Sequence, residues 1–475
     1  MVDEMDCALQ TKALLPRVAR LMKLFGTDGI RGKANEDPIT PEMALRTGRA
    51  IAAIMGHASD SSKRVVIGKD TRVSGTMLEY ALASGLASAG FEVLLAGVIP
   101  TPAIAYLTVA EACTAGVMIT ASHNPYEDNG WKIFGSDGYK LNDELEEQME
   151  DWLLAPSTQE TLDCQKSVGR ITPLTDAADR YIQHLTQAAG SLSLQGLSMV
   201  IDAGNGAGYQ VAAEIFRRLG AEVIVQQDQP NGTNINDRCG ALHPQVAAAL
   251  VVEHGADLGL SLDGDADRAI FTDAQGQPVS GDRIMALIAL ALKQRGELRG
   301  DAIAVTVMSN LGLHAAMKNA GIRVITTAVG DRHVIEALRE HRHSFGGENS
   351  GHLIFADHAT TGDGILSALQ VLRLLKESGQ SLQQLANCME EYPQQLKSFA
   401  VPAKPALESL GGFSALLDEA DAALGDHGRQ LIRYSGTENK ARVMVEHRDP
   451  GIVAHWTEKL SAALLEAIEE SLAPK

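Results

Sequence analysis

The chain has 475 residues, a length that typically divides into about three domains and can bury several hydrophobic cores. Its 41 basic and 60 acidic side chains leave a formal charge of −19, which argues against nucleic acid or an anionic membrane as a partner. The aromatic content of only 4% also disfavours binding to nucleic acid by base stacking, and 45% apolar residues are typical of a folded globular protein.

The first 21 residues are expected to form an appended helix without a motif. Asp3, Glu4 and Asp6 precede any apolar run, which is wrong for a secretory signal or a transit peptide. No apolar run reaches the ~18 residues of a membrane span. The cysteines are far apart and form no CxxC pair, which is typical of reduced thiols and predicts a cytoplasmic protein. They are Cys7, Cys113, Cys164, Cys239 and Cys388.

A pattern of apolar strand, helix, glycine and second apolar strand occurs three times, and the copies begin at Arg64, Ser198 and Ala302. A glycine ends a helix at low cost because it adopts a left-handed conformation. The three glycines are Gly90, Gly220 and Gly321. Apolar strands without alternation are typical of sheets covered on both faces. The repeat predicts three similar α/β domains, with one large doubly wound domain as the alternative.

The C-terminal segment follows a different pattern. Strands are expected at Arg429–Tyr434 and Ala441–His447, with helices near Phe413–Leu424 and from Val453 to Ser471. Paired strands with helices on one side indicate an α+β domain. The two prolines in Val401–Pro405 are typical of a linker.

Three aspartates alternate with small residues at Asp263, Asp265 and Asp267, directly before Arg268. In an extended chain alternate residues face the same way, so the three carboxylates can converge on one cation. Three carboxylates without nitrogen or sulfur ligands favour Mg²⁺ over Zn²⁺. An EF-hand does not fit, because its final glutamate would fall on Ala274. A solvated acidic turn is the alternative, and the apolar strand before the motif argues against it.

Ser122 lies in Thr120–Pro125, directly after a small apolar strand. A serine at a strand end lies at the rim of the sheet, where α/β active sites are found. The GxSxG motif of hydrolases is absent, and His123 is expected to point elsewhere, so a Ser–His dyad is not expected. Taken alone, a serine that caps a turn is the better interpretation. Lys132 is a candidate base or phosphate partner, with a surface lysine as the alternative.

Hydroxyls, a glycine and flanking cations occur together in Arg433–Arg442. Glycine lets backbone amides approach an anion and arginine binds it through two bonds, so this loop is a candidate phosphate cradle, with an ordinary polar hairpin as the alternative. A chain of charge −19 needs such local cations to attract an anionic substrate. Two weaker motifs are Gly346–His352, suited to a ligand with many hydroxyls, and Phe25–Gly32, expected to hold Arg31 on a compact turn.

The motifs, in this order, resemble the α-D-phosphohexomutase superfamily from Met22 to the C-terminus. Thr306–Leu313 and Asp357–Gly364 are similar to the branch that acts on glucosamine phosphates. The resemblance implies interconversion of glucosamine 6-phosphate and glucosamine 1-phosphate through a phosphoserine and a sugar 1,6-bisphosphate, in the pathway to UDP-N-acetylglucosamine. A glucose or mannose phosphomutase, a phosphatase that uses Ser122, and an inactive sugar-phosphate binding protein are the alternatives.

The resemblance also implies roles for individual residues. Ser122 carries the phosphate and, with Asp263, Asp265 and Asp267, holds one Mg²⁺. The residues implied near the transferring group are Ser122, Lys132, Arg268, His352 and Arg31, with Lys132 and His352 as candidates for general acid and base. The residues implied to bind the substrate are Glu348, Ser350, Arg433, Ser435, Gly436, Thr437 and Arg442.

The expected fold is α/β, with three similar domains of mixed sheet between helices and a C-terminal α+β domain, arranged around a central cleft. The expected divisions are an extension at 1–21, a phosphoserine domain at 22–176, a metal domain at 177–280, a sugar domain at 281–394 and a phosphate domain at 395–475. The expected partner is a small amino-sugar phosphate, with neither nucleic acid nor membrane. The oligomeric state stays open, with a homodimer as one candidate.

Overall fold

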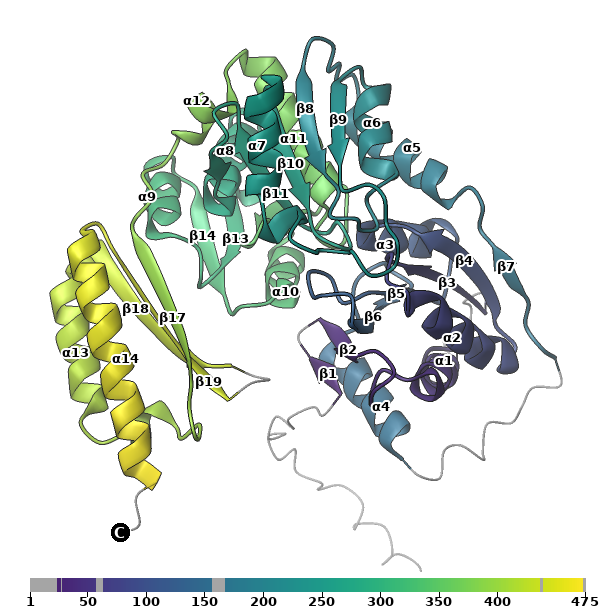
Figure 1. Cartoon of the computed structure of the whole chain (residues 1–475), viewed down its shortest axis with the longest axis horizontal. Coiled ribbons are helices and arrows are strands. Elements are labelled where there is room, and N and C mark those ends of the chain that lie inside the picture. Colours follow the sequence, from purple (N-terminus) through teal and green to yellow (C-terminus); the bar gives the residue numbers. More distant parts are fainter. Residues whose placement is uncertain (1–23, 27, 57–62, 156–166, 436–438, 473–475) are drawn as a thin grey trace, which may run out of the picture.

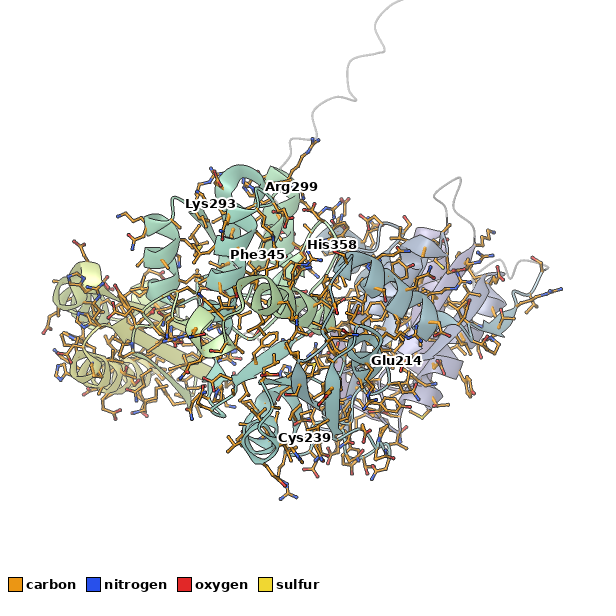
Figure 2. The ribbon with its side chains drawn as sticks, turned by 90° about the horizontal axis from the view of Figure 1, so that it is seen from above. Glu214, Cys239, Lys293, Arg299, Phe345 and His358 are labelled. Carbon is orange, nitrogen blue, oxygen red and sulfur yellow. The ribbon has the colours of Figure 1, made fainter. Side chains whose placement is uncertain are left out.

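The structure, a computed structural model, describes residues 24–26, 28–56, 63–155, 167–435 and 439–472. These residues form four separate sheets, each with its own helices (Figure 1). Viewed from above, the first and the fourth of these units lie at opposite ends and the second and third lie between them (Figure 2). The expected helix in residues 1–21 lies outside the described residues.

The first unit is built on a seven-stranded sheet of order β1-β2-β6-β5-β3-β4-β7. Its strands are β1 (Phe25–Gly26), β2 (Gly29–Lys33), β3 (Arg64–Lys69), β4 (Glu92–Val98), β5 (Ala115–Ile119), β6 (Asp128–Gly135) and β7 (Ile171–Pro173). Its helices are α1 (Pro41–Met55), α2 (Gly75–Ser88), α3 (Thr101–Ala110) and α4 (Asp143–Leu154). The central strands β3 and β5 are parallel, and the antiparallel strand β6 extends the sheet toward β2.

The second unit has a five-stranded sheet of order β12-β11-β10-β8-β9. Its strands are β8 (Ser198–Asp202), β9 (Glu222–Gln226), β10 (Leu258–Leu262), β11 (Ala269–Asp273) and β12 (Pro278–Val279). Helices in this part of the chain are α5 (Ala177–Ala189), α6 (Val211–Arg218), α7 (Gln245–His254) and the short 3₁₀ turn η1 (Gly240–Leu242). The hairpin between β10 and β11 carries the aspartate motif.

The third unit has a four-stranded sheet of order β14-β13-β15-β16. Its strands are β13 (Ala302–Thr306), β14 (Arg323–Thr327), β15 (Phe345–Gly347) and β16 (Leu353–Phe355). The helices are α8 (Gly281–Gln294), α9 (Leu311–Asn319), α10 (Asp331–His341), α11 (Gly364–Ser378) and α12 (Leu382–Ala386), with a 3₁₀ turn η2 (Arg299–Asp301) before β13. One continuous core joins side chains of the first three units, including Met118, Leu262 and Phe345.

The fourth unit is a three-stranded antiparallel sheet, β17-β19-β18, with helices packed against it. Its elements are β17 (Gln394–Ala400), η3 (Leu407–Ser409), α13 (Phe413–Leu424), η4 (Gly425–His427), β18 (Gly428–Tyr434), β19 (Lys440–His447) and α14 (Pro450–Leu472). It has its own core. The expected α+β pattern is confirmed, but the linker prediction for Val401–Pro405 is wrong. This segment follows β17 inside the fourth unit, and Val401 is buried in its core.

The repeated strand–helix–glycine–strand pattern is confirmed as three parallel strand pairs, β3 with β4, β8 with β9, and β13 with β14. The glycines before the second strands have the left-handed conformation that the pattern predicts. Their φ angles are 83° at Gly90, 98° at Gly220 and 66° at Gly321. The alternative of a single doubly wound domain is wrong, because the three pairs belong to three sheets. Within the described residues, no helix has both the length and the apolar character needed to cross a membrane.

The fourth unit joins the third through a buried carboxylate. Glu446 on β19 accepts a hydrogen bond from the backbone N–H of Leu311, at 2.6 Å, where α9 begins. The same carboxylate is paired with Arg429 at 2.8 Å, and Arg429 also donates to the carbonyl of Ser309. The joint therefore lies in the Thr306–Leu313 motif.

Asp282, in the first turn of α8, lies buried near this joint. Burial raises its pKa to about 7, and Glu446 and Glu391 act in the same direction. Because this pKa lies above the unfolded value of about 3.9, the residue costs stability as the pH rises from about 4 to about 7. We expect Asp282→Asn to gain about 2–4 kcal/mol in unfolding free energy over wild type between pH 4.5 and pH 8.

Denaturant titrations at several pH values measure this difference. Asp301→Asn is the control, because Asp301 is 61% exposed. A wild type and an Asp282→Asn variant with parallel pH profiles would contradict the prediction.

Candidate active site

Ser122 follows β5 in a loop whose backbone is strained. Its φ angle is 51°, in the left-handed region that non-glycine residues avoid. The backbone N–H of Ser122 donates to Thr120 Oγ1 at 2.8 Å, and Thr120 Oγ1 donates to Asp70 Oδ2 at 2.7 Å. Strain of this kind persists only where neighbouring groups hold it. The loop therefore presents a buried hydroxyl in one fixed orientation.

Arg72 is the main support of this loop. Its buried guanidinium donates to the carbonyls of Ser122 at 3.0 Å, Asn124 at 2.8 Å and Asp128 at 3.0 Å, and also to that of Pro125. Its Nε donates to Asp70 at 2.8 Å. An arginine side chain has five N–H groups, so the donors match these five bonds in number.

We expect Arg72→Lys to lower kcat by about 10²-fold with little change in KM, because an ammonium cannot hold four carbonyls in one plane. Steady-state kinetics separate the two constants. A merely structural role would lower the melting temperature and leave the kcat of the folded fraction unchanged. Arg49→Lys is the control, because Arg49 donates to Ser88 Oγ on α2, away from the loop.

His123 lies closer to the nucleophile candidate than expected. Its Nδ1 is 3.4 Å from Ser122 Oγ, so the expectation that it points elsewhere is wrong. The left-handed turn at Ser122 breaks the alternation of an extended chain and brings the two side chains to one side. Burial, with Arg268 and Arg31 nearby, lowers the pKa of His123 to about 4, so its imidazole is neutral at pH 7.

The three aspartates meet at the β10–β11 hairpin. One carboxylate oxygen from each of Asp263, Asp265 and Asp267 lies within 4.8 Å of the others, and all three side chains are buried. The segment is a turn rather than the extended chain expected, since Ala266 has a φ of 57° and its N–H donates to the Asp263 carbonyl at 3.0 Å. The carboxylates therefore converge because the backbone turns.

The hairpin places these carboxylates beside the serine. Ser122 Oγ donates to Asp263 Oδ2 at 2.8 Å. Gly264 makes this approach possible, because a Cβ there would lie 2.5 Å from the Ser122 carbonyl oxygen. From the same unit, the amide of Asn236 donates to the Ser122 carbonyl at 2.9 Å. Burial first, and then Asp267 and Asp265, raise the pKa of Asp263 well above its usual value.

The triad fits a hard cation. Oδ1 of Asp265 is buried without a hydrogen-bond partner among the described residues, and Oδ1 of Asp267 has only the longer ion-pair contacts of His352 Nδ1 at 3.6 Å and Arg268 Nε at 3.8 Å. A buried carboxylate oxygen without a donor is costly, and a divalent cation satisfies it. Oxygen-only ligands are those that Mg²⁺ prefers. These residues can therefore hold a metal ion, as the sequence predicts.

Lys132 is buried on β6, so the alternative of a surface lysine is wrong. Its Nζ lies 2.9 Å from Asp265 Oδ2, 2.9 Å from Asp267 Oδ2 and 3.1 Å from Asp28 Oδ2. Burial disfavours the ammonium, but the three carboxylates outweigh it and raise the pKa of Lys132 well above the usual value. Lys132 therefore carries a positive charge in the site.

Arg31 lies on strand β2, not on the compact turn expected, because this segment pairs with β6 and sets Arg31 opposite Gly130. Its guanidinium is paired with Asp28, which connects Arg31 to Lys132. Arg268 follows the triad, and its backbone N–H donates to Asp263 Oδ1 at 3.1 Å. The structure thus brings Arg31, Lys132 and Arg268 to the serine and the triad.

His352 reaches the same network from the third unit. Its Nδ1 lies 3.6 Å from Asp267, and its Nε2 lies 3.4 Å from Asp331. Burial lowers the pKa of this imidazole, but Asp267 and Asp331 raise it to about 10 overall. These two carboxylates favour the protonated ring, while its Nε2 also lies 3.2 Å from the N–H of Gly362.

The sugar-loop candidates lie between β15 and β16. Glu348 accepts a hydrogen bond from Gly330 N–H at 3.2 Å, and Ser350 Oγ is buried without a partner among the described residues. Gly351 fits closely against the second unit, because a Cβ there would lie 2.4 Å from the Ala269 carbonyl oxygen. This contact joins the sugar loop to the triad hairpin.

The phosphate-cradle candidates lie apart from these groups, on the fourth sheet (Figure 1). Arg433 on β18 is paired across the hairpin with Arg442 on β19. Burial and the neighbouring Arg442 lower the pKa of Arg433. Ser435 N–H donates to the Lys440 carbonyl at 2.9 Å and closes the loop. Gly436 and Thr437 lie outside the described residues.

Sequence reasoning missed five residues that the fold brings to the site. Asp28 lies in the motif Phe25–Gly32, where the sequence pointed only to Arg31, and Asp331 is the first residue of α10. Lys140 bridges them, at 2.7 Å from Asp331 and in contact with Asp28. Arg72 and Asn236 act on backbone carbonyls far along the chain, and no local pattern signals that. The five are Asp28, Arg72, Lys140, Asn236 and Asp331.

Comparison with known proteins defines the class. Four models of the phosphoglucomutase/phosphomannomutase type match consecutive parts of the chain: alpha/beta/alpha domain I at 22–160, domain II at 179–276, domain III at 280–392 and the C-terminal domain at 377–463. The order and number of the four units are those of α-D-phosphohexomutases.

Curated relatives show which family within this class the chain is most similar to. The phosphoglucosamine mutase of Sorangium cellulosum is 49% identical over 95% of this chain and 94% of its own length. That of Bdellovibrio bacteriovorus is 46% identical over 93% of this chain and 98% of its own length. The chain belongs to the phosphoglucosamine mutase family.

Solved structures show the same fold at lower identity. A phosphoglucomutase/phosphomannomutase family protein from Burkholderia thailandensis has a TM-score of 0.77 and 23% identity, and the match covers 94% of this chain and 97% of that one. The N-acetylphosphoglucosamine mutase of Aspergillus fumigatus, crystallised with GlcNAc-6P and magnesium, has a TM-score of 0.68 and 19% identity over 94% and 96% of the two chains.

Proposed function

We propose that this protein is an isomerase that interconverts glucosamine 6-phosphate and glucosamine 1-phosphate through a phosphoserine at Ser122 and a sugar 1,6-bisphosphate. The observation that carries the proposal is the hydroxyl of Ser122, 2.8 Å from Asp263 in a cluster of three buried aspartates. Identity of 46–49% to phosphoglucosamine mutases over nearly the full length supports the reaction and the substrate.

The bound cation is Mg²⁺ in this proposal, held by Asp263, Asp265, Asp267 and the phosphate on Ser122. A divalent cation supplies charge compensation to the phosphoryl group that moves. The chain contributes cations of its own at Lys132, Arg268 and Arg31. Phosphoryl transfer depends mainly on alignment and charge, so these side chains need not form covalent bonds.

Each transfer moves one phosphoryl group between two oxygens. The bond from phosphorus to Ser122 Oγ breaks and a bond from phosphorus to a sugar hydroxyl oxygen forms. The sugar hydroxyl loses its proton and Ser122 Oγ gains one as it becomes a hydroxyl again, so the protons balance over the transfer. Lys132 and His352 were candidates for general acid and base. Because both pKa values are raised, both residues hold their protons at pH 7, and we assign them charge stabilisation and proton donation.

The substrate is held at two further places. Glu348 and Ser350 bind sugar hydroxyls, and Arg433, Ser435, Gly436, Thr437 and Arg442 bind the phosphate that is not being transferred. An intermediate that must turn end over end needs one phosphate site that serves both poses. A site on the separate fourth unit can follow the ligand, and closure onto a cleft between the four units would exclude water from the phosphoserine.

We further propose domain limits of 22–176, 177–280, 281–394 and 395–475, a cytoplasmic location, and a place in the pathway to UDP-N-acetylglucosamine. The fourth limit agrees with the start of β17 at Gln394 to within one residue. Neither a nucleic acid nor a membrane partner is part of the proposal.

Relative turnover of glucosamine, glucose and mannose 6-phosphates tests the substrate. We expect kcat/KM for glucosamine 6-phosphate to exceed the other two by at least about 10²-fold, because a site built for an amine leaves buried groups unpaired when the amine is missing. A preference for glucose or mannose phosphate would reject the substrate and keep the reaction type. Release of inorganic phosphate equal to substrate loss would indicate a phosphatase.

A further inference from the structure

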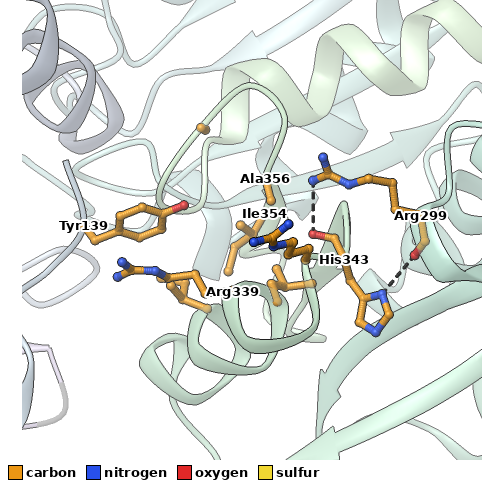
Figure 3. Close-up of a pocket in the computed structure, with 10 residues that line it drawn as sticks. Tyr139, Arg299, Arg339, His343, Ile354 and Ala356 are labelled. Carbon is orange, nitrogen blue, oxygen red and sulfur yellow. Dashed lines mark hydrogen bonds between the residues drawn. The ribbon is translucent and has the colours of Figure 1, made fainter. Parts of the chain in front are cut away.

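A second cavity, of about 350 Å³, lies on the third unit where it meets the first. None of the residues that line it belongs to the site described above. Its apolar lining includes Ile335, Leu338 and Ile354. Tyr139 lies on one side of it (Figure 3). Its volume falls within the range of small-molecule sites, about 300–1,000 Å³.

Three arginines line this cavity: Arg299, Arg339 and Arg342. The guanidinium of Arg339 lies over the Tyr139 ring, 4.0 Å from its centre, on one side of the cavity, and Arg299 lies on the other (Figure 3). In a chain of charge −19, three guanidiniums around one cavity form a local region of positive potential.

A bound anion can replace the ion pairs that these arginines form in the structure. Arg299 is paired with Asp357 at 2.8 Å and Arg339 with Asp137 at 3.3 Å, and all four side chains are about half exposed. Such surface pairs contribute little to stability. Within the described part of the chain, the Arg342 side chain has neither an ion pair nor a hydrogen bond. Phosphate oxygens bind arginine through two parallel bonds and would compete with these pairs.

We propose that this cavity binds a nucleotide. The flat base would lie on the apolar residues beside Tyr139 and Arg339, and the phosphates would contact Arg342 and Arg299. An apolar lining alone would suit many ligands, and arginines alone would suit any anion. The two together select a molecule with a flat ring at one end and phosphates at the other.

The cavity shares two elements with the candidate active site. Tyr139 precedes Lys140, which contacts Asp331 at 2.7 Å. Asp331 is the first residue of α10, and Arg339 lies in the last turn of that helix. A nucleotide would therefore touch both the first and the third unit, next to Lys140 in the first unit and at the opposite end of α10 from Asp331 in the third.

Isothermal titration of the full chain with ATP and with UTP tests the proposal, in excess Mg²⁺ so that chelation does not contribute. We expect at least one of them to bind with a Kd below about 1 mM. Arg342→Ala and Tyr139→Ala should each weaken that binding at least about tenfold. Arg218→Ala should leave it unchanged, because Arg218 is a half-exposed, ion-paired arginine on α6 in the second unit.

Two further titrations show where the nucleotide binds. Saturating glucosamine 6-phosphate should not displace the nucleotide, and inorganic triphosphate should bind at least about tenfold more weakly because it has no ring. Displacement by the sugar phosphate, equal binding to Arg342→Ala, or no binding of either nucleotide would overturn the proposal. Ser122→Ala should bind the nucleotide as wild type does, so this result stands or falls independently of the proposed mutase activity.

Discussion

Ser122→Ala should lose at least about 10⁴-fold in kcat/KM, because it removes the oxygen that stores the phosphoryl group. Intact-protein mass spectrometry should show one removable phosphate on the wild type and none on the variant. The same protein samples serve for the activity assay, so the loss of the phosphate and the loss of turnover can be compared directly.

Two controls show whether a loss of activity in Ser122→Ala comes from the missing hydroxyl. Ser122 adopts a left-handed φ of 51°, so the thermal unfolding of Ser122→Ala must be measured to show that the loop and the fold persist. Ser193→Ala is the matched control, since Ser193 is an exposed serine in a loop of the second unit, and it should keep both phosphate and activity. A fully active Ser122→Ala variant would reject the proposed mechanism.

Asp265→Asn should lower kcat by about 10²–10³-fold and raise the Mg²⁺ concentration needed for half-maximal activity. The change keeps the shape of the side chain and removes its negative charge. Asp265 accepts hydrogen bonds from Thr101 Oγ1 at 2.6 Å and from Lys132 at 2.9 Å, and its other oxygen is one of those without a donor. Chelation with EDTA should abolish activity, and added Mg²⁺ should restore it.

Asp273→Asn is the matched control for this variant. Asp273 is a buried carboxylate at the other end of β11, where it accepts from the N–H groups of Gln275 and Gln277. Its replacement should leave the Mg²⁺ dependence unchanged. If Asp265→Asn kept the wild-type metal requirement, or if EDTA had no effect, the assignment of the triad as the metal site would fail.

Local patterns in the sequence determined much of the architecture. Helix-ending glycines such as Gly90, followed by apolar strands, predicted three similar α/β units, because helix termination and strand burial depend on neighbouring residues. In the structure each unit contains one such parallel strand pair. The aspartate motif likewise predicted a convergent set of carboxylates. The prediction held although its geometric premise was wrong, since the left-handed turn at Ala266 brings the carboxylates together.

The charge state of the site depends on contacts between distant segments. The residues next to Lys132 and His352 in the sequence do not indicate that either side chain is a buried cation. Lys132 becomes so because Asp265 and Asp267 arrive from the second unit, and His352 because Asp267 arrives from the second unit and Asp331 from helix α10 of its own unit. The position of His123 depends likewise on one backbone angle, at Ser122.

The sequence by itself determined the class of fold, the identity of the nucleophile and metal-ligand candidates, and the likeness to phosphohexomutases, because these features depend on residue types at short spacing. Only the tertiary structure decided how Arg72 and Asn236 support the Ser122 loop, which groups are charged, and where three arginines gather around a second cavity. The hydrogen bonds to the Ser122 carbonyl join residues far apart in the chain, since Arg72 lies 50 positions and Asn236 lies 114 positions from Ser122. No local sequence pattern indicates which of these distant residues come into contact.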